Sequence, residues 1–188
     1  RDRVRAANET GASVTNKELC LEIKEHPNGQ TVYRKNVRLE SLKEGENLQT
    51  YQIKVPNAHL WSVDSPRLYD LKISLNDDAV TERFGFRWFE IKDVKGDRQF
   101  FLNGKRIVLR TAISWGFWPY NGITPSDELA KRQITIAKEL GLNMLNFHRN
   151  IGQTNILDYA DELGLLYFEE PGGNQYPIKN FNDNDKQS

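Results

Sequence analysis

Cysteine is nearly absent from the sequence, and Cys20 is the only one. A single thiol excludes a disulfide within the chain and any metal cluster built from several cysteines, and it leaves the cellular compartment open. Histidine is also sparse: His26 and His59 lie in the first half of the chain, and His148 lies in the second. We therefore expect no metal site.

Long apolar runs and an excess of charge of one sign are missing as well. No apolar run approaches the roughly 18 residues that span a bilayer. The 26 basic residues balance 26 acidic ones, which gives a formal net charge of zero. The sequence therefore carries no basic footprint of the kind that binds nucleic acid or an anionic membrane, and we expect neither partner.

Residues 1–91 contain stretches in which apolar and polar residues alternate, LCLEI (19–23), YQIKV (51–55) and YDLKISL (69–75). Period two is typical of strands with one buried face. Turn-forming sequences separate the stretches, among them HPNG (26–29), KEGEN (43–47) and DSP (64–66). The pattern predicts an antiparallel β-sandwich over residues 1–91, with buried side chains at Leu21, Ile23, Ile53, Leu71 and Ile73.

The pattern changes from about residue 100, within the second predicted domain, 92–188. FFLNGKRIVLR (100–110) predicts a hairpin that turns at Asn103-Gly104 and then a strand from Ile107 toward Ser114. Thr124-Pro125-Ser126-Asp127 predicts a helix start, with Thr124 as N-cap. We expect Gly141 to end this helix, whose apolar face follows helical spacing at Ala130, Ile134, Ala137 and Leu140.

A repeat sets the architecture of this half. ELGLNMLNF (139–147) and ELGLLYFEE (162–170) share Glu-Leu-Gly-Leu at an interval of 23 residues, each time as a helix end that leads into an apolar strand. The helix between them carries Ile156, Ala160 and Leu163 on one face. This order requires parallel strands joined by right-handed crossovers, and three such strands are predicted. The final segment, NQYPIKNFNDNDKQS (174–188), is predicted to be a loop or tail.

Parallel βα units form either a doubly wound sheet or a (β/α)8 TIM barrel. Neither a Gly-rich phosphate loop nor a P-loop follows the first strand, so we favour the barrel and expect no cofactor. In either fold the loops after the carboxyl ends of the strands build the functional site. WGFWPYNG (115–122) is the first of these loops. Its aromatic residues indicate a binding surface or, alternatively, a hydrophobic cluster under the loop, and the sequence leaves both open.

Five stretches together resemble glycoside hydrolase family 2, the group of β-galactosidases, β-glucuronidases and β-mannosidases. HLWSVDSPRLYDLKISL (59–75) resembles the end of that family's immunoglobulin-like sandwich, and RFGFRWFEI (83–91) resembles its passage into the catalytic barrel. The first three barrel strands are matched by FFLNGKRIVLR, ELGLNMLNFHR and LDYADELGLLYFEEPG. The resemblance implies an immunoglobulin-like β-sandwich followed by the first three βα units of a TIM barrel, a truncated one.

The catalytic carboxylates of such an enzyme are not expected in this sequence. Retaining glycosidases use two carboxyl groups about 5 to 5.5 Å apart. Glu169 and Glu170 are neighbours on a predicted strand and point to opposite faces, so they cannot form this pair. The resemblance implies that the two glutamates lie on the fourth and seventh barrel strands, which a barrel of about 250 residues places beyond Ser188. We therefore assign no catalytic residue.

The resemblance does imply substrate-binding residues. Trp115 occupies the position of a histidine in the family's Asn-Arg-His, and its indole suits the apolar face of a pyranose. His148 and Arg149 take the serine and histidine positions of Arg-x-Ser-His-Tyr-Pro, a change that argues against a galactose-type or glucuronide-type contact set. Arg110 matches the arginine of Leu-Arg-Gly, and Glu170 the acidic residue at the end of the third strand. Each has a structural alternative: core packing, an internal ion pair or a solvated carboxylate.

The sequence leaves open two carbohydrate-related functions, and a third in which a sandwich adhesion module carries an unrelated α/β domain. The first is a fragment of a β-galactosidase-like glycosidase that hydrolyses terminal β-linked sugars, inactive by itself. The second is a non-catalytic carbohydrate-binding or scaffold module of the same fold, since fold alone does not decide function. In both cases a carbohydrate is the expected partner. Because an open parallel sheet has an unpaired edge, we also expect the chain to self-associate.

Overall fold

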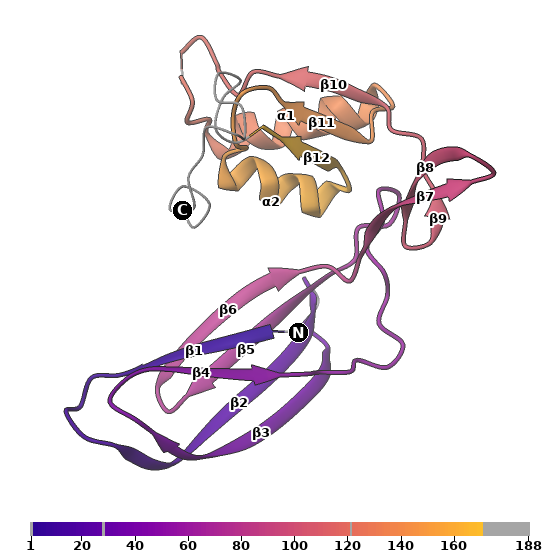
Figure 1. The fold of residues 1–188 in the computed structure, drawn as a ribbon. Helices are drawn as coiled ribbons and strands as arrows, with labels where there is room; N and C mark the ends of the chain where they lie inside the picture. The colour runs from indigo at the N-terminus through magenta and orange to yellow at the C-terminus, as the bar shows by residue number, and fades with distance from the viewer. Residues whose placement is uncertain (1, 28, 121, 171–188) are drawn as a thin grey trace, which may run out of the picture. The chain divides into compact units, whose positions relative to one another are not determined.

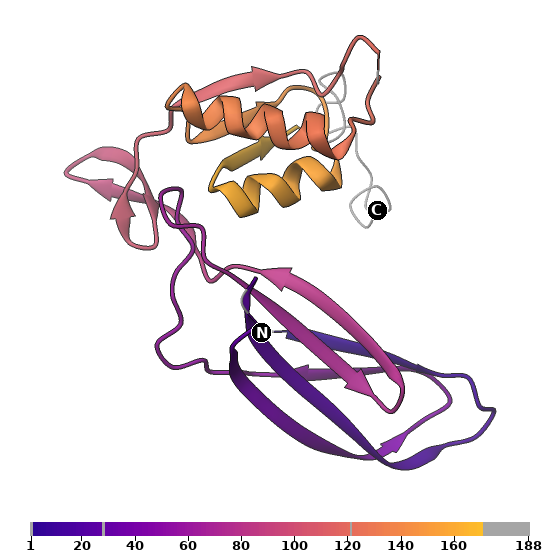
Figure 2. The same ribbon diagram turned by 180° about the vertical axis from the view of Figure 1, so that it is seen from behind.

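The computed structural model describes residues 2–27, 29–120 and 122–170, with the backbone alone for residues 2–7. The predicted tail at 174–188 lies outside these residues. The chain divides into two compact units, Arg1–Leu60 with Arg67–Phe86, and Trp61–Pro66 with Arg87–Ser188. Figures 1 and 2 show strands alone in the first unit and both helices in the second.

The first unit contains two antiparallel sheets. One pairs β1 (Asp2–Asn8) with β4 (Gly45–Tyr51). The other has the strand order β3-β2-β5-β6 and consists of β2 (Val14–His26), β3 (Thr31–Leu42), β5 (Leu68–Leu75) and β6 (Asp78–Phe84). The antiparallel arrangement predicted from the period-two pattern is confirmed.

Alternation along β2 and β5 explains the core of this unit. Leu21 and Ile23 on β2 and Leu71 on β5 are buried, as predicted. Ile53 and Ile73 are only partly buried at the edges of the same clusters, so their predicted full burial is wrong. Ile53 lies two residues beyond the end of β4 at Tyr51.

The second unit begins with an antiparallel sheet of three short strands, β7 (Phe89–Val94), β8 (Asp97–Leu102) and β9 (Lys105–Arg106). The predicted turn at Asn103-Gly104 connects β8 to β9, and both residues have positive φ, 53° and 75°. The strand expected from Ile107 is shorter than predicted, because β10 spans only Thr111–Ser114.

Parallel βα units follow, in the order β10, α1 (Asp127–Glu139), β11 (Met144–Phe147), α2 (Thr154–Leu163), β12 (Leu166–Glu169). The strands pair in parallel as β10-β11-β12, and the described residues form no closed barrel. Both helices lie on one face of this sheet, as Figures 1 and 2 show. Their buried residues form a single core with the sheet: Ala130, Ile134, Ala137, Leu145, Phe147, Ile156, Ala160 and Leu165.

The ends of the helices agree with the repeat but not with the predicted N-cap. Gly141 and Gly164, the glycines of the two Glu-Leu-Gly-Leu copies, have φ of 77° and 81° where α1 and α2 end. The N-cap of α1 is Ser126, whose side chain accepts a hydrogen bond from the Leu129 N–H, so the assignment to Thr124 is wrong. Leu140 is also exposed rather than part of the apolar face, because α1 ends before it.

The short segment Trp61–Pro66 belongs to the second unit although the first unit precedes and follows it. Trp61 is fully buried, and its indole N–H donates to the Asp161 carbonyl oxygen at 2.7 Å. The Arg87 guanidinium lies 4.3 Å from the centre of the Trp61 ring and forms an ion pair with the Asp161 carboxylate at 2.8 Å. These contacts fix the segment against the end of α2.

Candidate functional site

Three side chains lie together just past the carboxyl ends of the parallel strands. Trp115, His148 and Glu170 each follow the last residue of a strand, β10, β11 and β12 respectively. The last residues themselves are in register across the sheet. We call these three residues the rim row, because they form the next row along the edge of the sheet.

The rim row faces away from the helices. Ser114 accepts a hydrogen bond from Gln133 of α1 at 2.9 Å, and Phe147 is buried in the core with both helices. Glu169 accepts from the Gly152 N–H at 3.0 Å. Since successive strand residues point to opposite faces, the following residues project to the face that the helices leave uncovered.

Direct contacts hold the rim row together. The rings of Trp115 and His148 meet edge to face, with centroids 4.6 Å apart and an interplanar angle of 81°. His148 Nδ1 lies 3.3 Å from Glu170 Oε2. Glu170 in turn accepts hydrogen bonds from Asn146 Nδ2 at 3.2 Å and from the Arg149 N–H at 3.1 Å. An aromatic face, an imidazole and a carboxylate are thus positioned by one connected network.

The electrostatics of this network favour an ionised Glu170. The pKa of its carboxyl group is lowered chiefly by the hydrogen bond from the Arg149 N–H, with further lowering from Asn146 and His148. Partial desolvation opposes this effect without reversing it. Glu170 therefore presents a negative charge to His148 near neutral pH.

The structure brings four of the five predicted binding residues to this edge and leaves one elsewhere. Arg149 is exposed beside His148 and has a positive φ of 57°. Arg110, in contrast, precedes β10 at the opposite end of the strand, and its Nε donates to the Gly141 carbonyl oxygen at 2.6 Å. Its position stabilises the carboxyl end of α1, where cationic side chains are favourable.

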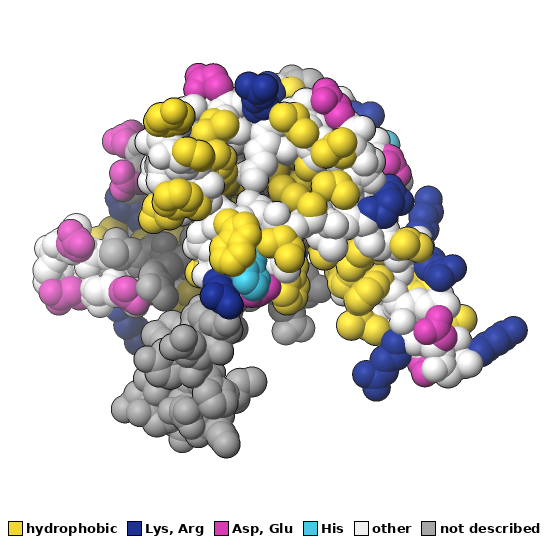
Figure 3. Space-filling model, turned by 90° about the horizontal axis from the view of Figure 1, so that it is seen from above, with side chains coloured by type: hydrophobic (Ala, Val, Ile, Leu, Met, Phe, Trp, Pro, Cys, Tyr) yellow, Lys and Arg dark blue, Asp and Glu magenta, His cyan; other side chains and the backbone are white. Residues whose placement is uncertain are grey.

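Different residues of the aromatic loop fit each of the two interpretations that its sequence left open, a binding surface and a hydrophobic cluster. Trp118 is partly buried and packs against the core of the parallel unit. Trp115, Phe117 and Tyr120 are exposed by 62%, 65% and 101%. Figure 3 shows exposed hydrophobic side chains over much of the face seen from above. The loop is therefore anchored by one aromatic residue and presents the others to solvent.

Sequence reasoning missed Asn146 as a member of the network. Its amide group holds Glu170, and its Oδ1 is buried without a hydrogen-bond partner among the described residues. The signal was available, because Asn146 of β11 lies two residues before His148, and residues two apart along an extended chain share a face. A partly buried polar residue within an apolar strand is the kind of exception that calls for a partner.

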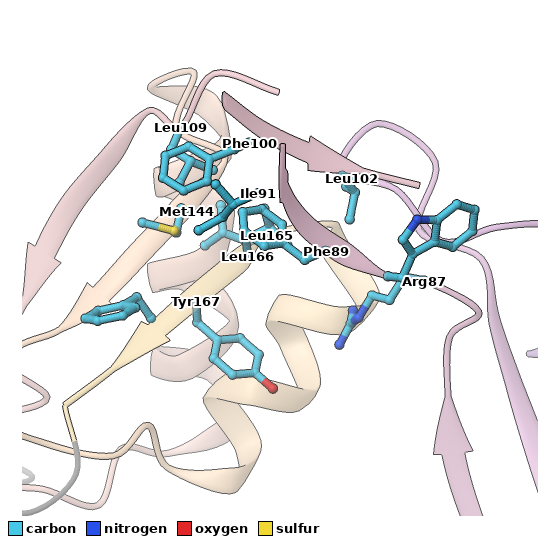
Figure 4. A pocket seen from close by; sticks show the side chains of 12 residues that line it. Arg87, Phe89, Ile91, Phe100, Leu102, Leu109, Met144, Leu165, Leu166 and Tyr167 are labelled. Carbon is cyan, nitrogen blue, oxygen red and sulfur yellow. The ribbon is translucent and has the colours of Figure 1, made fainter. Parts of the chain in front are cut away.

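A second concave feature lies on the same face toward the amino ends of the strands. This cavity of about 690 Å³ separates the β7-β8 hairpin from the parallel sheet (Figure 4). Phe89, Ile91 and Phe100 line it from the hairpin, and Met144 and Leu166 from the sheet. Its lining is almost entirely apolar, so it offers little to orient a polar ligand. The rim row is the better candidate site.

Among residues 2–27, 29–120 and 122–170, no three histidine, cysteine, aspartate or glutamate side chains gather as metal ligands would. No helix in the described part of the chain is long and apolar enough to cross a membrane.

Comparisons with known proteins decide the family. Residues 4–87 match the model of glycosyl hydrolases family 2. A β-galactosidase of Thermoanaerobacterium thermosulfurigenes is 32% identical over 156 residues, which are 79% of this chain and 21% of that protein. The chain belongs to glycoside hydrolase family 2.

Other relatives agree with membership of family 2. A putative β-glucuronidase of Formosa agariphila is 33% identical over 121 residues, covering 62% of this chain and 14% of that protein. The crystal structure of a Bacteroides uniformis β-glucuronidase superposes with a TM-score of 0.76 at 27% identity, over 89% of this chain and 20% of that one. The chain thus spans about one fifth or less of the length of these family 2 proteins.

Proposed function

We propose that this chain is the portion of a family 2 β-glycosidase that joins an immunoglobulin-like sandwich to the first three βα units of a TIM barrel. Its antiparallel sheets, followed by parallel βα units, support this assignment. The relatives are several times longer, which supports an origin in a larger enzyme that hydrolyses terminal β-linked sugars.

The observation that carries the proposal is the rim row. Trp115, His148 and Glu170 project from equivalent positions at the carboxyl ends of three parallel strands, where enzymes of this architecture bind their substrates. The exposed indole of Trp115 offers an apolar face for a pyranose ring, while His148 and Glu170 offer hydrogen-bonding groups for hydroxyls. Arg149 completes the proposed contact set, and Arg110 is left out because it lies at the other end of β10.

The chain itself is proposed to bind a sugar without cleaving it. Glu170 belongs to the rim row, whereas Glu169 accepts the Gly152 N–H on the helix side of the sheet. Two carboxyl groups that face opposite sides of a strand cannot flank one glycosidic bond. We propose that the catalytic glutamates of the enzyme lie outside this sequence.

A panel of chromogenic β-glycosides tests the proposal. We expect no turnover by this chain and turnover by the longer protein that carries it. Activity of the chain that survives repurification and disappears in Glu169→Gln or Glu170→Gln would show that the carboxylates are misassigned. If the longer protein binds sugars but hydrolyses none of the panel, the protein is a carbohydrate-binding module and the proposed enzyme activity is refuted.

Self-association also remains a prediction. Ile113 and Phe168 flank Asn146 in register on the uncovered face of the sheet and are 61% and 55% exposed. Light scattering over a range of chain concentrations tests it.

A further inference from the structure

Asn150 lies in the loop that follows β11, two residues beyond His148 of the rim row. Its side-chain oxygen Oδ1 accepts a hydrogen bond from the Ile151 N–H at 2.8 Å. Because a backbone N–H donates only to an acceptor, this bond identifies which end of the amide group is the oxygen and directs Nδ2 away from the Ile151 N–H. The side chain of Asn150 is thus held in one orientation by its own loop.

The amide group of Asn150 packs against the backbone of Gly116 in the aromatic loop. Gly116 has a φ of 61°, and a Cβ built on it would lie 2.7 Å from Asn150 Nδ2 and 3.6 Å from Asn150 Cγ. A side chain at position 116 would collide with the amide group, so this close approach requires a glycine. Gly116 directly follows Trp115, and its N–H donates to Ser114 Oγ at 3.3 Å. The contact therefore constrains the backbone next to the exposed indole of Trp115.

The main chain of Asn150 reaches the segment that follows β12. Its carbonyl oxygen accepts a hydrogen bond from the Glu170 N–H at 3.3 Å. Asn146 Nδ2 and the Arg149 N–H bind the side chain of Glu170, whereas Asn150 binds its backbone. Asn150 thus contacts a residue that follows each of the three parallel strands.

We propose that Asn150 is a positioning residue that holds the three members of the rim row in place relative to one another. The rim row lies beyond the last paired residues of β10, β11 and β12, so strand pairing alone does not fix it. For its effect on ligands the inference rests on the proposed sugar-binding function, because one pyranose must reach all three side chains at once. The positioning itself is a property of the chain and is measured without a ligand.

The first experiment measures the geometry of the rim row by NMR of the full chain. Nuclear Overhauser contacts between the indole of Trp115 and the imidazole of His148 report their edge-to-face packing, in which the ring centroids are 4.6 Å apart. We expect these contacts in the wild type and their loss or clear weakening in Asn150→Ala, which should still unfold cooperatively in urea. Ring contacts that are undisturbed in Asn150→Ala would overturn the inference.

Two glycines of the aromatic loop supply a matched pair of variants. Gly116 and Gly122 have nearly the same φ, 61° and 60°, so alanine introduces similar backbone strain at both positions. Apart from its chain neighbours, no atom of the described residues lies within 4 Å of a Cβ built on Gly122. Gly116→Ala should therefore weaken the ring contacts, and Gly122→Ala should retain them. Equal effects would show that loop strain, rather than the amide group of Asn150, controls the rim row, and would overturn the inference.

The double variant Gly116→Ala with Asn150→Ala separates the collision from the strain. The Cβ of Asn150 lies 4.0 Å from a Cβ built at position 116, so truncating Asn150 makes room for the new methyl group. In the Asn150→Ala background, Gly116→Ala should lower the urea midpoint no more than Gly122→Ala does. A cost as large as in the wild-type background would contradict the direct contact between the two residues.

Titration calorimetry with methyl β-D-galactopyranoside and methyl β-D-glucuronide measures the consequence for binding. Asn150→Ala should weaken the affinity about fivefold, the effect of one ordinary hydrogen bond, and Gly122→Ala should leave it unchanged within about twofold. If Asn150→Ala leaves the affinity unchanged, the positioning role is refuted and the sugar site stands. If neither glycoside binds the wild type, the sugar-binding function is refuted, and the ring contacts alone decide the positioning role.

Discussion

The indole N–H of Trp61 donates to the main-chain carbonyl oxygen of Asp161, 100 residues further along the chain. Nothing in the sequence around Trp61 or Asp161 predicts this contact. Trp61 is nonetheless fully buried within the second unit, with the Arg87 guanidinium over its ring. The contact shows that a segment from the predicted sandwich half is part of the parallel unit's packing.

Replacing Trp61 should therefore destabilise the parallel unit strongly. We expect Trp61→Ala to lower the free energy of unfolding by about 3 to 5 kcal/mol, the usual cost of truncating a buried large aromatic residue. Trp88 is 48% exposed in the same unit and supplies the control, since Trp88→Ala should cost less than about 1 kcal/mol. Amide hydrogen exchange of α2 measures the effect locally. Equal protection of α2 in the two variants would contradict the anchoring role.

Replacement by alanine should cost different amounts of stability at Gly141 and Gly164, the two glycines of the repeat. Both have positive φ, so a methyl group introduces backbone strain of about 1 to 2 kcal/mol at either site. A Cβ on Gly141 would meet no atom within 4 Å, whereas a Cβ on Gly164 would lie 2.4 Å from the Val63 carbonyl oxygen. Gly164→Ala should therefore be clearly less stable than Gly141→Ala in urea denaturation. Similar midpoints would show that the Val63 backbone moves aside freely.

The carboxyl group of Glu170 should titrate below its ordinary value. Its lowered pKa means that folding favours the ionised form, first through the Arg149 N–H. The resulting stability is present above the unfolded pKa of about 4.3 and is lost as the pH falls through the folded pKa. Carbon-13 NMR should give a midpoint below about 4.3 in the wild type and a higher one in Asn146→Ala. A wild-type midpoint at or above the ordinary value would contradict the network.

Particular residues show where sequence reasoning succeeds and where it fails. The repeat predicted both helix ends and both following strands, because glycine at a helix end and apolar strand residues are local signals. The N-cap was misplaced because Thr124-Pro125 and Ser126 both satisfy the same local rule. Arg110 was grouped with the site by resemblance, although its place before β10 puts it at the amino end. The network of Asn146 and Glu170 depends on strand register, which the sequence does not give directly.

Truncating Trp118 should cost much more stability than truncating Trp115. Trp115 is exposed apart from its contact with His148, so Trp115→Ala should change the free energy of unfolding by less than about 1 kcal/mol. Trp118 packs against the core, and Trp118→Ala should cost more, toward about 3 kcal/mol. Thermal unfolding of both variants measures the difference. A large loss in Trp115→Ala would mean that this residue only packs.

The central claim is that the rim row binds a sugar, and NMR of the tryptophan indole groups during a pyranoside titration tests it most directly. The Trp115 indole N–H resonance should shift saturably as the glycoside is added, while that of the exposed Trp88 should stay in place. Trp115→Ala should abolish the binding, as measured by titration calorimetry with the same glycoside. No shift of the Trp115 resonance with any neutral or uronic acid pyranoside, or an equal shift of Trp88, would contradict the account.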